Sequence, residues 1–254
     1  MAPDPSSDPE AGAATLTFAE AESLLGDAEM SLLGLMPNSS NYTFLVELAH
    51  PAGKVFGVYK PARGESPLWD FPAGNLHRRE VAAYRLARFL EWPLIPPTVI
   101  REDGPHGVGS LQLYIESNPG RDFMTARRDT PDAFLPVALF DVFTNNADRK
   151  AGHCLLDPQR RLWVIDHGLT FNTDYKLRTV LWDFAGEPLP AALAPALERL
   201  AVSLERGEPM ARELRGLVSA GELAVLRRRI AECLDPAWRF PEPTSGWSVP
   251  WPMV

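Results

Sequence analysis

The stretch Phe140–Phe171 constrains the fold most, because it places a short polar run inside an otherwise apolar region. Within it, two apolar runs, His153–Leu156 and Leu162–Ile165, are separated by a turn signal. Short apolar runs bounded by turn residues predict two strands of a buried hairpin. Two acids, Asp148 and Asp166, flank this hairpin on two loops. Loops held by a rigid scaffold commonly carry chemistry, so we expect the functional site here.

The composition indicates a globular protein and excludes several functional classes. The 254 residues are 45% hydrophobic and 23% charged, which is enough to bury a core as one large domain or two lobes. The net charge of −8 argues against a general nucleic-acid or membrane-surface binder. The two cysteines, Cys154 and Cys233, lie far apart, so we expect neither a disulfide framework nor a zinc site. With no secretory signal and no apolar run near the ~20 residues that span a bilayer, we expect a cytoplasmic protein without a membrane span.

The first half of the chain predicts a β-rich lobe. Residues 1–14 are small, acidic and rich in proline, which predicts a disordered tail. The run Phe18–Leu25 predicts a short helix, with Thr17 as its N-cap and Gly26 just beyond its end. Further runs predict three consecutive strands, an amphipathic helix and a second hairpin, which we expect to complete an N-lobe over residues 15–116. Their ranges are 29–36, 42–48 and 55–60 for the strands, 76–91 for the helix, and 99–101 with 110–116 for the hairpin.

The second half predicts a helical lobe. The polar segment Ser117–Thr130 predicts a loop that acts as a hinge between the lobes. Helical patterns at 131–143, 189–204 and 211–233 predict a C-lobe over residues 117–235. Residues 236–254 carry five prolines and three tryptophans, which predicts a tail that is either packed across the surface or flexible. Strands followed by helices indicate the α+β class.

Four features occur in a fixed order along the chain: a small polar turn, a lysine that ends a strand, a glutamate on the next helix, and the two acid loops. This order resembles the protein-kinase-like superfamily, specifically the phosphatidylinositol 3-/4-kinase catalytic domain, and is most similar to type II phosphatidylinositol 4-kinases and their small bacterial relatives. The resemblance implies a two-lobed protein-kinase-like fold with a β-rich N-lobe and a reduced helical C-lobe. The strongest matches are Val58-Tyr59-Lys60-Pro61, Ala147-Asp148-Arg149 and Val164-Ile165-Asp166-His167-Gly168.

The resemblance also implies a nucleotide site for ATP in the N-lobe. Lys60 would pair with the α- and β-phosphates and would be held by Glu80. The turn residues Ser39, Ser40 and Asn41 would cover the phosphates with backbone N–H groups and short side chains. Glu116 lies at the end of the second hairpin, where the hinge backbone of the family meets adenine.

The resemblance places catalysis and metal binding on the two acid loops. Asp148, with Arg149 beside it, would orient the attacking hydroxyl or accept its proton, and Asp166 would hold Mg²⁺. The family has asparagine five residues after the catalytic aspartate, whereas this chain has His153. Neutral imidazole suits softer metals than Mg²⁺. His153 would therefore bind Mn²⁺ or Mg²⁺ weakly, hydrogen-bond Asp148, or mark a nucleotide-binding protein with little turnover. A further departure is His167, where many kinases have phenylalanine.

Three functional hypotheses follow. The first is an ATP-dependent phosphotransferase acting on a small molecule, a lipid head group or a protein hydroxyl. The second is a pseudokinase, a nucleotide-binding regulatory module without phosphoryl transfer. The third is a metal-dependent hydrolase that uses Asp148, His153, Asp166 and His167, although their spacing fits no known ligand motif.

Taken singly, each site residue also has a structural explanation, such as a surface lysine at Lys60 or a surface ion pair at Glu80. We expect the loop Glu65–Phe71 to pack rather than to act as a lid. We expect the basic residues Lys176 and Arg178 to form a solvated loop.

Overall fold

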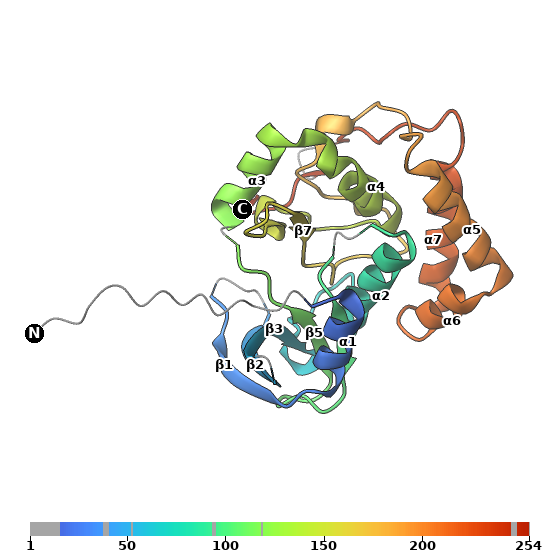
Figure 1. Cartoon of the computed structure of the whole chain (residues 1–254). Coiled ribbons are helices and arrows are strands. Elements are labelled where there is room, and N and C mark those ends of the chain that lie inside the picture. The colour runs from blue at the N-terminus through green and yellow to red at the C-terminus, as the bar shows by residue number, and fades with distance from the viewer. Residues whose placement is uncertain are drawn as a thin grey trace, which may run out of the picture.

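The computed structural model describes residues 16–37, 41–51, 53–92, 95–117, 119–244 and 248–253. In this part of the chain one lobe is built on a β-sheet and the other is mostly helical (Figure 1). The strands β1, β2, β3 and β5 lie together at one end of the molecule, and the helices α4, α5 and α7 lie at the other. The predicted α+β class, with a β-rich N-lobe and a helical C-lobe, is confirmed.

The N-lobe contains a five-stranded antiparallel sheet with the order β1-β2-β3-β5-β4. The predicted meander and second hairpin are both present. The helix α2 connects the third and fourth strands, and α1 precedes the sheet. The bounds are α1 Phe18–Asp27, β1 Met30–Leu35, β2 Phe44–His50, β3 Gly53–Pro61, α2 Leu76–Phe89, β4 Thr98–Arg101 and β5 Gly109–Leu113.

The register of β2 and β3 separates two faces of the sheet. Val46, Leu48 and Tyr59 lie on one face and form a buried cluster with Leu25 of α1 and Leu111 of β5. Because side chains alternate along a strand, Lys60 lies on the opposite face. The pairing register of β2 and β3 therefore fixes which side of the sheet carries the lysine.

The start of α1 follows its sequence signal. The side chain of Thr17 accepts a hydrogen bond from the backbone N–H of Glu20 at 3.3 Å, and the carboxylate of Glu20 accepts one from the backbone N–H of Thr17 at 2.8 Å. This is the reciprocal capping box. The predicted end was wrong, because the helix continues through Gly26 to Asp27.

The C-lobe surrounds one large hydrophobic core. That core also includes residues of α2, such as Leu86 and Leu90, so α2 packs against the C-lobe as well as the sheet. The predicted hairpin is formed by β6 and β7, which pair in antiparallel register. The helices are α3 Pro119–Asp129, α4 Leu135–Thr144, α5 Ala194–Arg206, α6 Pro209–Arg215 and α7 Ala220–Cys233, and the strands are β6 Cys154–Leu156 and β7 Leu162–Val164.

Two predicted segments of the C-lobe were wrong. The expected loop at 117–130 contains the helix α3, in which Phe123 and Ala126 are buried although most of the segment is polar. The expected helix 211–233 is divided into α6 and α7. The division occurs at Ser219, which begins α7 with a second capping box to Glu222. The signal was present in the sequence, but the apolar periodicity on both sides obscured it.

The described part of the C-terminal tail packs along the C-lobe. The backbone N–H of Phe240 donates to the carbonyl of Glu187 at 2.9 Å, and Phe240 is buried. Further along, the carbonyl of Met253 accepts a hydrogen bond from the backbone N–H of Ala151 at 2.9 Å, next to the predicted catalytic loop. Of the two alternatives for the tail, the described residues favour the packed one. None of the helices in the described ranges has the length and apolarity that a membrane crossing requires.

Candidate active site

Three segments bring Lys60, Glu80 and Asp166 together. The Nζ atom of Lys60, on β3, lies 2.5 Å from Oε1 of Glu80 on α2 and 3.1 Å from Oδ1 of Asp166 after β7. The second oxygen of Glu80, Oε2, accepts the backbone N–H of His167 at 2.8 Å. The side chain of Glu80 is 3% exposed, whereas that of Asp166 is 48% exposed. Glu80 therefore holds the lysine from the buried side, and the carboxylate of Asp166 is accessible to solvent.

The charges in this triad stabilise one another. Partial burial acts to lower the pKa of Lys60, but Asp166 and Glu80 outweigh it and raise the pKa. For Asp166, desolvation opposes ionisation, but Lys60 and His153 hold the pKa of the carboxyl well below its usual range. Lysine and aspartate are therefore both charged across the physiological pH range. A cation beside a partly open carboxylate suits a phosphate and a metal ion together.

Asp166 has a left-handed backbone with a φ of 62°, which is uncommon for a residue other than glycine. Glycine takes this conformation most readily, and Gly168 lies two residues later in the same turn. In the structure the aspartate takes it instead. Strain of this kind costs of order 1–3 kcal/mol and persists only where the surroundings enforce it, as at functional sites.

The loop after α4 presents Asp148. Its backbone N–H donates to Oδ1 of Asn146 at 2.9 Å, and its Oδ2 lies 3.0 Å from Nζ of Lys150. Burial raises the pKa of Asp148, although the ion pair with Lys150 acts in the opposite direction. The carboxylate of Asp148 remains 25% exposed, so it is accessible to a ligand.

Arg149, predicted as a catalytic residue, has no side-chain atom that is accessible from the solvent. Its side chain is fully buried, and its Nε atom lies 2.9 Å from Oδ2 of Asp141 on α4. Its other nitrogens donate to the carbonyl of Ile165 at 2.8 Å and to Nε2 of His167 at 2.7 Å. The residue therefore ties the Asp148 loop to α4 and to the Asp166 loop. Its geometry is that of a positioning residue rather than of one that contacts a substrate.

His153 lies beside Asp166 and not beside Asp148. Its Nε2 atom is 3.4 Å from Oδ2 of Asp166, and its Nδ1 faces the backbone N–H of Lys150 at 3.4 Å. Burial lowers the pKa of His153 to about 4; Asp166 opposes this shift, whereas the neighbouring cations add to it. The imidazole is therefore neutral near pH 7. With Nδ1 accepting a hydrogen bond, the proton is on Nε2 and points toward Asp166.

The hydrolase hypothesis is not supported. Among the described residues, no group of three or more His, Cys, Asp or Glu side chains is arranged to hold a metal ion. His167 in particular is fully buried, and Arg149 donates to its Nε2 atom. His167 is thus engaged with Arg149 and is not grouped with Asp148, His153 and Asp166 around a common point in the described part of the chain.

The predicted nucleotide-covering turn is described only in part. Ser39 and Ser40 lie outside the described residues. The Oδ1 atom of Asn41 accepts the backbone N–H of Ser66 at 2.7 Å, which joins this turn to the loop after β3. Glu116 is exposed in the segment that connects β5 to α3.

The loop between β3 and α2 contacts the segment that follows Asp166. Phe71 is buried against Leu76 and Ala147, which confirms the expected packing there. Trp69, in contrast, is 92% exposed. The Nζ atom of Lys176 lies 3.0 Å from Oδ2 of Asp70 and 4.9 Å from the centre of the Trp69 ring. Because the side chain of Lys176 is only 13% exposed, the expected solvated loop is wrong for this residue.

Sequence reasoning missed several residues that hold the site. Asp141 is fully buried on α4, and Asn146 donates to it at 2.9 Å while receiving the N–H of Asp148. A single acid inside an apolar helix signals a buried partner, so Asp141 was detectable. Lys150 belongs to the polar run that was already singled out. Arg79 donates to the carbonyl of Thr170 and pairs with Glu222. In the sequence it is one arginine among several on α2, so it gave no signal.

Comparisons with known proteins place this geometry in context. No family model matches the chain. Protein Rv2133c of Mycobacterium tuberculosis is 38% identical over an alignment of 265 positions. The alignment covers 90% of this chain and 94% of that protein. Phosphatidylinositol 4-kinase gamma 4 of Oryza sativa subsp. japonica is 29% identical over 126 residues, which cover 41% of this chain and only 22% of the plant protein.

Among solved structures, hydra Fam20 with sugar covers 84% of this chain and 86% of that chain with a TM-score of 0.55. At 14% sequence identity this likeness shows the fold alone, and the fold is kinase-like. The identity and coverage of the mycobacterial relative show that the chain belongs to the same family as Protein Rv2133c.

Proposed function

We propose that this member of the Rv2133c family is an ATP-dependent phosphotransferase of the phosphatidylinositol 3-/4-kinase-like type, which transfers the γ-phosphate to a hydroxyl acceptor. The observation that carries the proposal is the contact of Lys60 with both Glu80 and Asp166. These residues lie 20 and 106 positions from the lysine, so three separate elements converge on one charged group. Phosphoryl transfer depends mainly on such positioning and charge neutralisation.

In this proposal the nucleotide lies between the lobes, 15–116 and 117–235. Lys60 contacts its phosphates, and the turn containing Ser39, Ser40 and Asn41 covers them. Val58 precedes Lys60 by two residues on the same face of β3 and pairs with Leu45 of β2; both are half-buried. They offer an apolar surface to a planar base. The backbone near Glu116, in the segment between the lobes, would meet the edge of that base.

The residues present fit Mg²⁺ or Mn²⁺. Magnesium usually binds through one or two carboxylates together with substrate phosphates, and the open carboxylate of Asp166 supplies such a ligand. A bound ion would neutralise charge on the phosphates. His153 would become a second ligand only if its proton moved from Nε2 to Nδ1, at the expense of the contact with the N–H of Lys150. Imidazole suits Mn²⁺ better than Mg²⁺ in this role.

The chain's own groups account for the remaining steps. Asp148 would orient the acceptor hydroxyl and receive its proton, which its raised pKa favours. Lys150, 3.0 Å from that carboxylate, would stabilise negative charge as the phosphoryl group moves. Arg149 would hold the two loops in register. The acceptor itself would be a small molecule, a lipid head group or a protein hydroxyl.

The neutral His153 beside Asp166 favours a second candidate, a nucleotide-binding module without phosphoryl transfer. One experiment separates the two. Melting temperatures would be measured with ATP, ADP and GTP, each with Mg²⁺ or Mn²⁺, because a ligand of the native state raises the melting temperature. ADP production would be measured in parallel.

For an active phosphotransferase, Asp148→Asn would abolish ADP production while keeping the nucleotide-dependent shift. Asp166→Asn would remove the metal-dependent part of the shift. The exposed residue Asp132 allows the matched control Asp132→Asn, which should behave as the unmodified protein. ADP production that Asp148→Asn leaves unchanged would rule out the first candidate. Absence of any shift with every nucleotide would rule out both.

A further inference from the structure

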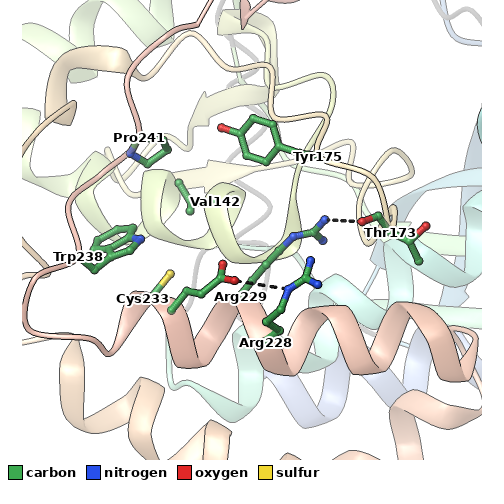
Figure 2. Close-up of a pocket in the computed structure, with 9 residues that line it drawn as sticks. Val142, Thr173, Tyr175, Arg228, Arg229, Cys233, Trp238 and Pro241 are labelled. Atoms are coloured by element: carbon green, nitrogen blue, oxygen red, sulfur yellow. Dashed lines mark hydrogen bonds and ion pairs between the residues drawn. The ribbon is translucent and has the colours of Figure 1, made fainter.

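A cavity of about 260 Å³ lies between α7, the end of α4 and the C-terminal tail (Figure 2). Its apolar wall includes Val142, Trp238 and Pro241, and its polar side includes Tyr175 and the neighbouring arginines Arg228 and Arg229. Figure 2 shows these side chains around one hollow. Lys60, Asp148 and Asp166 are not among its lining residues, so the cavity is separate from the candidate active site.

Arg229 is a buried cation that forms no ion pair with a carboxylate in the described part of the chain. Its side chain is 8% exposed, and its Nη2 atom donates to the backbone carbonyls of Asn172 at 2.8 Å and Thr173 at 3.2 Å. Among the described residues, no carboxylate lies within ion-pair distance of it, and its Nε and Nη1 atoms have no acceptor. Buried charges are normally paired, so the charge of Arg229 would suit an anion bound in the cavity.

The charge balance of the lining defines that anion. Arg228 is paired with Glu232, its Nε lying 3.4 Å from Oε1 of the glutamate. The pair is neutral, so Arg229 alone leaves one positive charge. Burial lowers the pKa of Arg229 to about 10; Arg228 adds to this shift, whereas Glu232 and Tyr175 oppose it.

We propose that this cavity is a binding site for a small monocarboxylate with an apolar body. A carboxylate carries the single charge required, and its oxygens accept charge-assisted hydrogen bonds from the nitrogens of Arg229 that the backbone carbonyls leave unused. A phosphate monoester, with about −1.5 to −2 charges, would exceed the charge available. The apolar wall requires an apolar body, and a volume below the roughly 300–1,000 Å³ of drug-sized sites limits its size.

The site lies behind the segment that follows Asp166. Arg229 and Asn145 both donate to the carbonyls of Asn172 and Asp174, so they hold the segment from the same side. The side chain of Asn172 in turn donates to the carbonyl of Asp70 in the N-lobe loop at 2.7 Å. A carboxylate bound to Arg229 would hold its guanidinium group in place, and the hydrogen bonds of that group would in turn stabilise the segment after Asp166. The site itself does not depend on phosphotransferase activity.

Sodium benzoate and sodium hexanoate serve as probes, with benzamide and hexanamide as uncharged matches. At about 10 mM, which suffices even for millimolar dissociation constants, the acids should raise the melting temperature of the full chain and the amides should not. Calorimetric titration would give the affinities. Equal shifts with acid and amide, or no shift with either acid, would overturn the proposal.

Two variants locate the site. Arg229→Gln should weaken benzoate binding at least tenfold, and Arg229→Lys, which keeps the charge, should retain most of it. Because loss of the carbonyl contacts could unfold the first variant, Val142→Phe provides an independent test: it fills the cavity with Arg229 intact and should also abolish binding. The exposed Arg212 on α6 provides the control Arg212→Gln. Unchanged benzoate affinity in a folded Arg229→Gln or Val142→Phe variant would refute the assignment.

Discussion

Replacing Arg149 by methionine tests whether this residue positions the site or takes part in the chemistry. The guanidinium is fully buried and makes a bidentate contact with Asp141, at 2.9 Å through Nε and 3.0 Å through Nη2. Methionine keeps the length of the side chain but removes the charge and the hydrogen-bond donors. The variant leaves the carboxylate of Asp141 buried without a counter-charge, and the carbonyl of Ile165 loses its donor.

The expected cost follows from that geometry. Removing one partner of a buried ion pair destabilises a protein by ~3–5 kcal/mol, because the remaining charge stays desolvated. For a chain of this size, such a loss lowers the melting temperature by roughly 6–20 °C. The loss should appear in urea unfolding as a lower midpoint with little change in slope. The exposed side chain of Arg178 provides the control Arg178→Met, which should change stability by no more than about 0.5 kcal/mol.

A double-mutant cycle isolates the pair. Asp141→Leu alone should be costly because it leaves the Arg149 cation unpaired. The double variant Asp141→Leu/Arg149→Met removes both charges, so it should be about 2–3 kcal/mol less costly than the sum of the single variants. ADP production should fall in parallel with stability, since the loops lose their register.

Two outcomes would contradict this reasoning. A stability loss below about 1 kcal/mol in Arg149→Met would mean that the buried pair does not hold the loops. Full stability combined with abolished turnover would mean that Arg149 contacts the substrate, as the sequence alone suggested.

The remaining predictions concern single residues. Lys60→Met should remove the ATP-dependent rise in melting temperature, and a persisting rise would exclude the lysine from the phosphate site. Because the pKa of His153 is about 4 in the folded state and about 6.5 when unfolded, its contribution to stability is present above pH 6.5 and is lost as pH falls toward 4. Lowering the pH from 7 to 5 should therefore reduce the free energy of unfolding of the natural protein by about 2 kcal/mol more than that of the His153→Asn variant. Equal reductions in the two proteins would contradict this. A Cβ at Gly109 would lie 2.5 Å from the carbonyl oxygen of Lys60. Gly109→Ala should therefore lower the free energy of unfolding by ~1–3 kcal/mol, measured in urea, and should weaken nucleotide binding, measured by thermal shift. Arg79→Met should cost ~3–5 kcal/mol, because it leaves the buried carboxylate of Glu222 unpaired, and a cost below about 1 kcal/mol would refute that pairing.

The sequence was sufficient for the architecture of the N-lobe, and it singled out Lys60, Glu80 and Asp166, which the fold brings into contact. The β-rich runs predicted β2 and β3, and in the structure the lysine at the end of β3 lies on the face opposite the apolar cluster. The distance along the chain between Lys60 and Asp166 gave no hint of contact by itself. Only the order of features, shared with a known superfamily, predicted that these residues meet.

The residues that the sequence did not reveal act through buried contacts between distant elements. Arg149 and Asp141 are eight positions apart, but the direction of the arginine side chain depends on how α4 packs against the hairpin. The helix α3 was missed because its apolar face is narrow and its other residues are charged. Local patterns carry no information on either point, since tertiary packing decides both.

The position of α2 determines how such a site is assembled. In protein kinases the ion pair between the strand lysine and the helix glutamate must be in place for transfer, and movement of that helix controls it. Here α2 is part of the C-lobe core, and Arg79, next to Glu80, binds both the carbonyl of Thr170 and the carboxylate of Glu222 on α7. Displacing Glu80 would therefore require breaking a buried ion pair and exposing part of the main core. The pair between Lys60 and Glu80 is thus built into the fold through the packing of α2.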